Sequence, residues 1–171
     1  GEDVTLLTFR PGGPIAATVD ARVRRQSLQS IYLHADWFAL GLTAAVQAIR
    51  PEVVLCHGRM ANCYSGRIQQ ALPSAAVLAT MRTGKALPRL FRRSLSRVRH
   101  VVANSREARD TLVRRHGVPP ERISVIHNAL VFPATTDDGR NNALRAAHGA
   151  GAGTLVLLNV AMFRPEKRHD H

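Results

Sequence analysis

Short apolar runs recur along the whole chain and define its predicted architecture. Each run is a continuous series of β-branched and aliphatic residues, which is typical of strands buried on both faces of a parallel sheet. Six strands are predicted in this way, at residues 4–9, 53–57, 75–80, 100–103, 123–126 and 155–160.

Amphipathic segments separate these runs and predict helices at about 36–50, 62–72, 87–97 and 105–116. The last of them has the clearest boundaries: Ser105 can cap its start, Glu107 favours its positive end, and Gly117 suits the left-handed position after its last turn. Strands that alternate with helices indicate βαβ units. The pattern therefore predicts an α/β fold built on a doubly wound parallel sheet.

The hydrophobic pattern is interrupted at 132–139, Phe-Pro-Ala-Thr-Thr-Asp-Asp-Gly, which is typical of a linker between domains. A short helix at about 141–148 and the apolar run at 155–160 follow it. We therefore expect a first domain at 1–131, a linker at 132–139, and the start of a second α/β domain at 140–171. The chain begins almost directly on a strand without an initiator methionine and stops four residues after Lys167, so we expect a piece of a longer protein.

The composition is strongly basic, with a net charge of +12 that comes almost entirely from arginine. Such a balance favours polyanionic partners, which include nucleic acid, acidic lipid and phosphorylated substrates. No apolar run approaches the roughly 18–20 residues of a membrane span, and the start has no signal-peptide character. Cys56 and Cys63 are expected to be reduced, and they do not form a metal site with His57, because adjacent strand residues point to opposite sides.

Arg164 and Lys167 follow the last apolar run and are the first candidates for a ligand site. Ligands of open α/β sheets bind beyond the carboxyl ends of the strands, where lysine can neutralise a phosphate and arginine can bind it with two hydrogen bonds. The plain alternative is two solvated charges on a surface loop. Spacing alone leaves both interpretations open.

His57, Gly58 and Arg59 follow the predicted strand at 53–57 and form a second candidate site. Histidine titrates near neutral pH and suits proton transfer, glycine allows close backbone approach, and arginine can bind an acidic group. A single histidine is more often structural. A catalytic role for His57 is therefore a hypothesis.

Residues 80–99 form a third candidate feature, a basic amphipathic segment. Its predicted apolar stripe consists of Leu87, Leu90, Phe91, Leu95 and Val98. Arg89, Arg93 and Arg97 form a ridge away from that stripe, which could lie against anionic lipid or a phosphorylated acceptor. A surface helix that covers a core would show the same pattern. Single-stranded RNA binding is disfavoured, because few aromatic residues accompany the arginines.

Three segments follow one another along the chain: Val-Val-Ala-Asn-Ser at 101–105, Glu-Arg-Ile-Ser-Val-Ile-His-Asn-Ala-Leu at 121–130, and residues 155–170. In this order they resemble segments of the retaining GT-B glycosyltransferases of family 4. Ala129 stands where the family usually has glycine. The resemblance covers roughly 50–171, and the first 50 residues add little to it.

The resemblance implies two Rossmann-like domains, with the acceptor on the N-terminal one and a nucleoside diphosphate sugar on the C-terminal one, without a metal ion or other cofactor. The family's phosphate-binding lysine corresponds to Lys167. Its arginine companion corresponds to Met162, so Arg164 would have to substitute for it. Arg82 occupies the usual place of the family's histidine near the sugar, and His57 lies one strand earlier.

The implied function is sugar transfer with retention to a glycan or a lipid-linked, anionic acceptor in lipopolysaccharide or other cell-envelope polysaccharide synthesis. The implied location is the cytoplasm, with peripheral contact with the inner face of the plasma membrane through the arginine ridge and no specific nucleic acid partner. A Glu-x7-Glu motif expected downstream of His171 would complete the donor site, so we expect the isolated chain to be inactive. A sugar-nucleotide epimerase or phosphorylase-like GT-B protein, a basic nucleic-acid-binding module and a membrane-adhering module remain as alternatives.

Overall fold

The structure is a computed structural model that describes residues 2–31, 39–82, 86–129, 138–151, 153–157 and 160. It divides into two compact units, residues 1–128 and 129–171. The larger unit contains all the strands found among the described residues. None of the described helices combines the length and the apolarity that a bilayer span requires.

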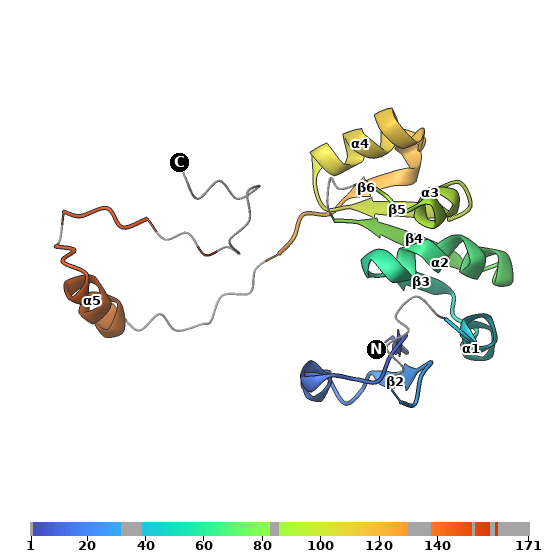
Figure 1. Cartoon of the computed structure of the whole chain (residues 1–171), viewed down its shortest axis with the longest axis horizontal. Coiled ribbons are helices and arrows are strands. Elements are labelled where there is room, and N and C mark those ends of the chain that lie inside the picture. The colour runs from blue at the N-terminus through green and yellow to red at the C-terminus, as the bar shows by residue number, and fades with distance from the viewer. Residues whose placement is uncertain are drawn as a thin grey trace. The chain divides into compact units, whose positions relative to one another are not determined.

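The main sheet has four parallel strands in the order β3 (Val53–Cys56), β4 (Ala76–Met81), β5 (His100–Ala103) and β6 (Ile123–Val125). Its strands are connected by α2 (Gly58–Ala71), α3 (Arg89–Leu95) and α4 (Arg106–His116). Figure 1 shows α2 across β3 and β4, with α4 beside β5 and β6. The predicted parallel α/β architecture is confirmed, because consecutive strands pair in parallel through helical crossovers.

A second, two-stranded parallel sheet joins β1 (Thr5–Thr8) to β2 (Arg24–Ser27). Between these strands lies a short 3₁₀ helix, η1 (Pro14–Thr18). The sequence pattern did not predict β2, because Arg-Arg-Gln-Ser has no apolar residue and its side chains are largely exposed. Phe9, directly after β1, packs against Tyr64 of α2 with their ring centroids 5.7 Å apart. This aromatic contact ties the small sheet to the larger core.

One face of the main sheet is fully buried by residues that stand in register on neighbouring strands. Val77, Ala79, Val101 and Ala103 have no measurable exposure, and helices α2 and α4 contribute the buried Ile68 and Leu112 to the same cluster. On the other face, Val53 and Leu55 of the edge strand β3 are 61% and 51% exposed. Complete cover on both faces, as expected from the continuous apolar runs, is therefore not found among the described residues at β3.

The helix boundaries follow local signals. The helix predicted at 36–50 forms as α1 (Leu42–Ile49), after Gly41, which has a left-handed φ of 77°. In α4, the Ser105 hydroxyl accepts the Ala108 N–H at 3.1 Å, Glu107 lies in the first turn, and Gly117 has a φ of 63°. The three signals predicted for this helix are confirmed. A second 3₁₀ turn, η2 (Pro120–Arg122), leads into β6.

The smaller unit contains one helix among its described residues, α5 (Asp138–Ala147), which begins within the predicted linker. Residues 155–157 and 160, from the predicted sixth strand, are not in a strand. Leu155 and Leu157 are 82% and 86% exposed. The strand prediction is wrong for these residues, because an apolar segment gains ladder hydrogen bonds only when a neighbouring strand is present to pair with it. The domain boundaries predicted from the sequence stay a prediction.

Candidate functional site

His57 lies at the turn between β3 and α2, at the carboxyl edge of the main sheet. It occupies the N-cap position of α2 with an extended backbone, and its exposed side chain makes no capping hydrogen bond. Gly58 has a φ of 82°, a left-handed conformation that glycine adopts without strain. Arg59 is exposed in the first turn of α2, which contains no acidic residue. The positive end of α2, Arg59 and the imidazole of His57 therefore face solvent together.

Arg82 follows β4 at the same edge of the sheet, and its side chain is exposed. The Arg82 carbonyl oxygen accepts a hydrogen bond from Nδ2 of Asn104 at 3.2 Å, and the Asn104 N–H donates to the Met81 oxygen at 3.1 Å. Among the described residues, the Arg82 guanidinium has no hydrogen-bond or ion-pair partner. The backbone at Arg82 is thus held in place while its charge remains available to a ligand.

The strand register places His57 and Arg82 at adjoining strand ends. Cys56 pairs with Ala79, so β4 extends two residues beyond the end of β3 before Arg82 begins. No hydrogen bond joins the two side chains among the described contacts. The structure therefore brings these two predicted residues to one edge without a hydrogen bond between their side chains.

Sequence reasoning missed the residues that connect these two turns. Asn62 of α2 is 2% exposed, and its side-chain amide bonds to both the N–H and the carbonyl of Thr80 in β4. The Thr80 hydroxyl donates to the Cys56 carbonyl oxygen at 2.8 Å. A polar residue on the buried face of an amphipathic helix was the available signal, because such a group requires a hydrogen-bond partner inside the protein.

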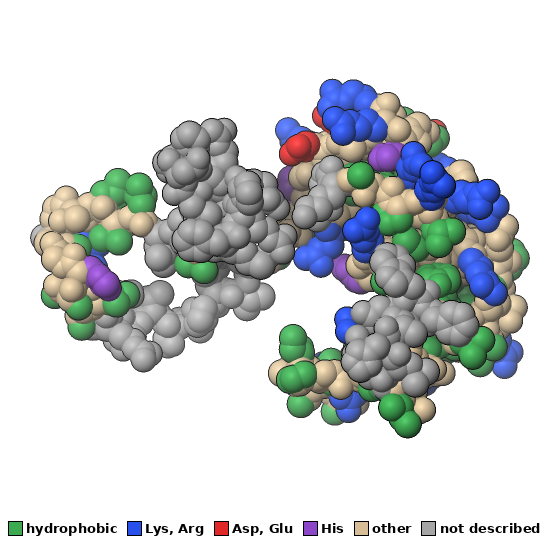
Figure 2. Space-filling view, in the orientation of Figure 1, with side chains coloured by type: hydrophobic (Ala, Val, Ile, Leu, Met, Phe, Trp, Pro, Cys, Tyr) green, Lys and Arg blue, Asp and Glu red, His purple; other side chains and the backbone are tan. Residues whose placement is uncertain are grey.

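Positive charge extends along the surface next to this edge. The chain has no Asp or Glu between Glu52 and Glu107, a stretch that spans β3 to β5. The ion pairs of the described residues lie elsewhere, for instance Arg22 with Asp20. Figure 2 shows basic side chains over the α3 and α4 side of the visible face, with little acidic surface. This part of the surface therefore favours an anionic partner.

The sequence profile of Glycosyltransferase Family 4 matches residues 1–130, most of the chain. The chain belongs to glycosyltransferase family 4. The match includes the first 50 residues, which carry none of the three resembling segments, and it ends before the third of these segments at 155–170.

The fold of this family 4 chain is also similar to that of a solved protein, the glycosyltransferase from Rickettsia africae ESF-5. The match has a TM-score of 0.59 and 12% sequence identity, and it covers 90% of this chain and 51% of that chain. The chain thus spans about half the length of that protein. The search of curated protein sequences found no match to this chain.

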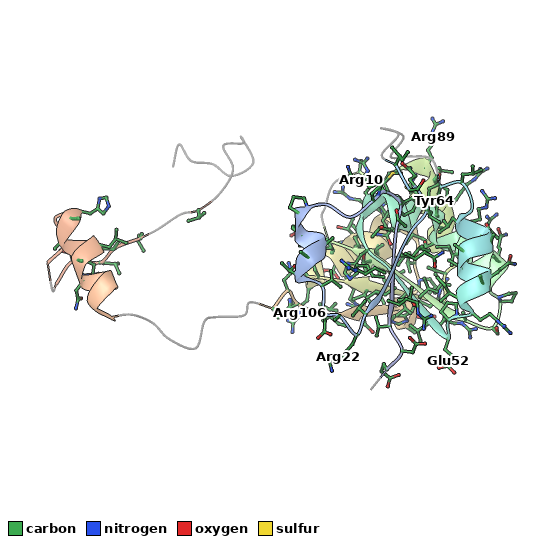
Figure 3. All side chains as sticks on the ribbon, turned by 90° about the horizontal axis from the view of Figure 1, so that it is seen from below. Arg10, Arg22, Glu52, Tyr64, Arg89 and Arg106 are labelled. Carbon is green, nitrogen blue, oxygen red and sulfur yellow. The ribbon has the colours of Figure 1, made fainter. Side chains whose placement is uncertain are left out.

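The predicted arginine ridge is only partly helical in this family 4 chain. Arg89 and Arg93 are exposed on α3, and Figure 3 shows Arg89 directed away from the ribbon. Arg97 follows the end of α3, and its Nη1 lies 3.4 Å from Oε1 of Gln70. Leu90 is 53% exposed, so its predicted place in the buried stripe is wrong. The seven-residue helix begins at Arg89 and buries Phe91, Ser94 and Leu95, which leaves Leu90 on the solvent side.

Arg164 and Lys167, the predicted donor-phosphate ligands, and Met162 lie outside the described residues.

The two cysteines, Cys56 and Cys63, are described, and both are free and buried. Burial raises the pKa of Cys56 to about 12, and it also raises the pKa of Cys63. Both thiols therefore stay protonated at neutral pH, which makes them poor nucleophiles.

His116, at the end of α4, should make stability depend on pH. Burial, followed by the charges of Arg92 and Arg115, lowers the pKa of His116 below its ordinary value of 6.5. The unfolded chain therefore binds more protons than the folded one as the pH falls below about 6.5. The free energy of unfolding is thus higher above that pH and decreases as the pH falls below it. Urea unfolding at pH 7.5 and 5.5 should show a smaller loss in His116→Gln and Arg92→Gln than in the unmodified chain. Identical losses in all three proteins would contradict this assignment.

Proposed function

We propose that this chain supplies the acceptor side of an enzyme that transfers a sugar, with retention, from a nucleoside diphosphate sugar to an anionic glycan or lipid-linked acceptor. The observation that carries the proposal is the open carboxyl edge of the main sheet, where His57 and Arg82 directly follow the adjacent strands β3 and β4. Ligands of open α/β sheets bind at this edge. Membership of family 4 supplies the class of reaction.

The side chains at this edge suit a phosphorylated or acidic sugar. Arg82 and Arg59 are exposed and have no carboxylate partner among the described residues, so an anion would meet unneutralised guanidinium groups. His57 presents an exposed imidazole, whose ring nitrogens can form hydrogen bonds with a sugar, at the positive end of α2. Arg82 thus anchors the acceptor, and His57 contacts the sugar that reacts.

The donor side of the proposal rests on Arg164 and Lys167. Lys167 would neutralise the donor diphosphate as a point charge, and Arg164 would bind it with two hydrogen bonds. Such contacts would stabilise the negative charge that develops on the leaving diphosphate. No metal ion takes part in this scheme.

A titration with α-glucose 1-phosphate, a simple phosphorylated sugar, tests the acceptor side. We expect amide chemical shifts to move at 57–59 and at Arg82 in the ¹⁵N-labelled chain. The Arg82→Gln variant should weaken this binding, whereas Arg22→Gln should not, because Arg22 lies between η1 and β2 and pairs with Asp20. Binding that is lost equally in both variants would reflect net charge alone and would contradict the proposed site.

The isolated 171-residue chain is expected to transfer no sugar. Transfer needs the groups that hold the donor as well as the acceptor edge, and this chain spans about half of the glycosyltransferase that it resembles in fold. Incubation with a panel of radiolabelled nucleoside diphosphate sugars and extracted membrane acceptors should give no labelled product. Turnover with any donor would contradict this part of the proposal.

The arginine ridge Arg89, Arg93 and Arg97 is proposed to hold the protein against an anionic membrane, where a lipid-linked acceptor would lie. Basic residues near an anionic surface contribute about 1 kcal/mol each. The triple change of these residues to glutamine should therefore reduce co-sedimentation with vesicles that contain phosphatidylglycerol.

The control for the ridge is the triple change of Arg22, Arg24 and Arg25 to glutamine. It removes the same net charge, but Arg22 and Arg24 already pair with Asp20 and Asp3, and all three arginines lie at or just before β2. Equal losses of vesicle binding in the two triple variants would indicate that net charge, not the ridge, drives binding.

A further inference from the structure

Asn62 continues the hydrogen-bond ladder of β4 where its neighbour β3 stops. The Ala76 N–H donates to the Glu52 oxygen at 2.8 Å, so the alternate residues Ala76, Leu78 and Thr80 direct their backbone polar groups toward β3. β3 ends at Cys56, and Thr80 has no strand partner on that side. Oδ1 of Asn62 accepts the Thr80 N–H at 2.9 Å, and its Nδ2 donates to the Thr80 oxygen at 2.8 Å. The side-chain amide thus takes the place of a peptide group.

The same two residues are also bonded to the turn that carries His57. Nδ2 of Asn62 donates to the carbonyl oxygen of Gly58 at 2.9 Å, and the Thr80 hydroxyl donates to the carbonyl oxygen of Cys56 at 2.8 Å. Asn62 and Thr80 are 2% and 5% exposed, so these bonds are shielded from water. We call this pair the clasp.

The clasp holds the backbone on both sides of the proposed acceptor edge. Cys56 and Gly58 flank His57, and Thr80 lies two residues before Arg82. The exposed side chains of His57 and Arg82 have no described hydrogen bonds of their own to set their positions. A fully satisfied buried polar network rigidifies the segments that it joins.

We propose that Asn62 and Thr80 are positioning residues that set the separation between the turns of His57 and Arg82. The inference rests on the proposed function, because the separation of these two turns matters only if both take part in binding the acceptor. A displacement of about 1 Å at a site can greatly reduce the effect of well-placed groups. The clasp is not itself a ligand contact, because its polar atoms already have partners inside the protein.

The opposite edge of the sheet provides a matched control on the same helix. Gln69 of α2 accepts the Val77 N–H at 3.2 Å through Oε1 and donates to the Ala75 oxygen at 3.0 Å through Nε2. It therefore extends the ladder of β4 at its amino end, as Asn62 does at its carboxyl end. A change at Gln69 also removes a link between α2 and β4, but it does so far along β4 from Arg82.

The experiment compares Thr80→Val, Thr80→Ser and Gln69→Leu by titration of the ¹⁵N-labelled chain with α-glucose 1-phosphate. Thr80→Val keeps the shape and removes the hydroxyl that bonds to Cys56. We expect its affinity to fall about fivefold, the effect of one hydrogen bond of ordinary strength. Thr80→Ser should restore the affinity, and Gln69→Leu should leave it unchanged even where it lowers the melting temperature. Equal weakening in Thr80→Val and Gln69→Leu would overturn the proposal.

Amide hydrogen exchange tests the role of the clasp independently of the proposed function. Thr80→Val should accelerate exchange at position 80, whose N–H donates to Oδ1 of Asn62. Gln69→Leu should instead accelerate exchange at Val77, whose N–H donates to Oε1 of Gln69. If the unmodified chain binds no sugar phosphate, the proposed acceptor site is wrong. The exchange pattern still shows whether the clasp holds the backbone at the end of β4. Similar exchange patterns in the two variants would overturn it.

Discussion

Replacing Phe91 with alanine should lower the free energy of unfolding by about 3–5 kcal/mol. Phe91 lies in α3 and is only 3% exposed, within the cluster that joins the helices to the main sheet. The change removes a large apolar side chain and leaves a cavity, because the surrounding residues relax only in part. Urea unfolding followed by circular dichroism at 222 nm would measure the loss.

Leu90→Ala is the matched control, because Leu90 is the preceding residue on the same helix and is 53% exposed. Its replacement should change stability by no more than about 0.5 kcal/mol. Comparable losses in the two variants would show that α3 is rotated from its described orientation. Burial of Phe91, Ser94 and Leu95 leaves Arg89 and Arg93 on the solvent side of α3, so the pair of variants also tests the orientation of these two arginines.

The strands at β4 and β5 could be predicted from the sequence because their apolar runs are buried by contacts from several elements. The His100–Ala103 strand has the predicted bounds, and β4 differs by one residue at each end. The strand β2 could not be predicted, because it exists through its pairing with β1 and not through apolar content. The run at 155–160 shows the reverse case, since apolar residues without a neighbour do not form a strand at the positions described.

The sequence indicated that His57 and Arg82 each follow a strand, and the pairing of β3 with β4 places the ends of these two strands side by side. Their roles in a site stay a prediction. The clasp depends on which residue of α2 faces the end of β4, and helical periodicity alone cannot choose among Asn62, Cys63 and Ser65. Periodicity also placed Leu90 in the buried stripe, because it does not specify where a short helix begins.

The contact between α2 and α3 leads to the second large expected effect. At Gly66 of α2, an added Cβ would lie 2.8 Å from the backbone Cα of Ser94 and 3.0 Å from its hydroxyl oxygen. Ser94 is itself held to α2, because its hydroxyl donates to the Cys63 oxygen at 3.0 Å. Real Cβ contacts with backbone atoms are not this short, so the two helices would have to move apart.

Gly66→Ala should therefore destabilise the protein by about 1–3 kcal/mol, although alanine is the better helix former. Gly13→Ala is the control, because a Cβ at Gly13 meets no atom within 4 Å and its φ is −84°. Thermal unfolding of both variants would give the comparison. A Gly66→Ala protein as stable as the unmodified chain would mean that α2 and α3 are not packed this closely. Contacts with α2 would then not fix the orientation of α3, the helix on which Arg89 and Arg93 lie.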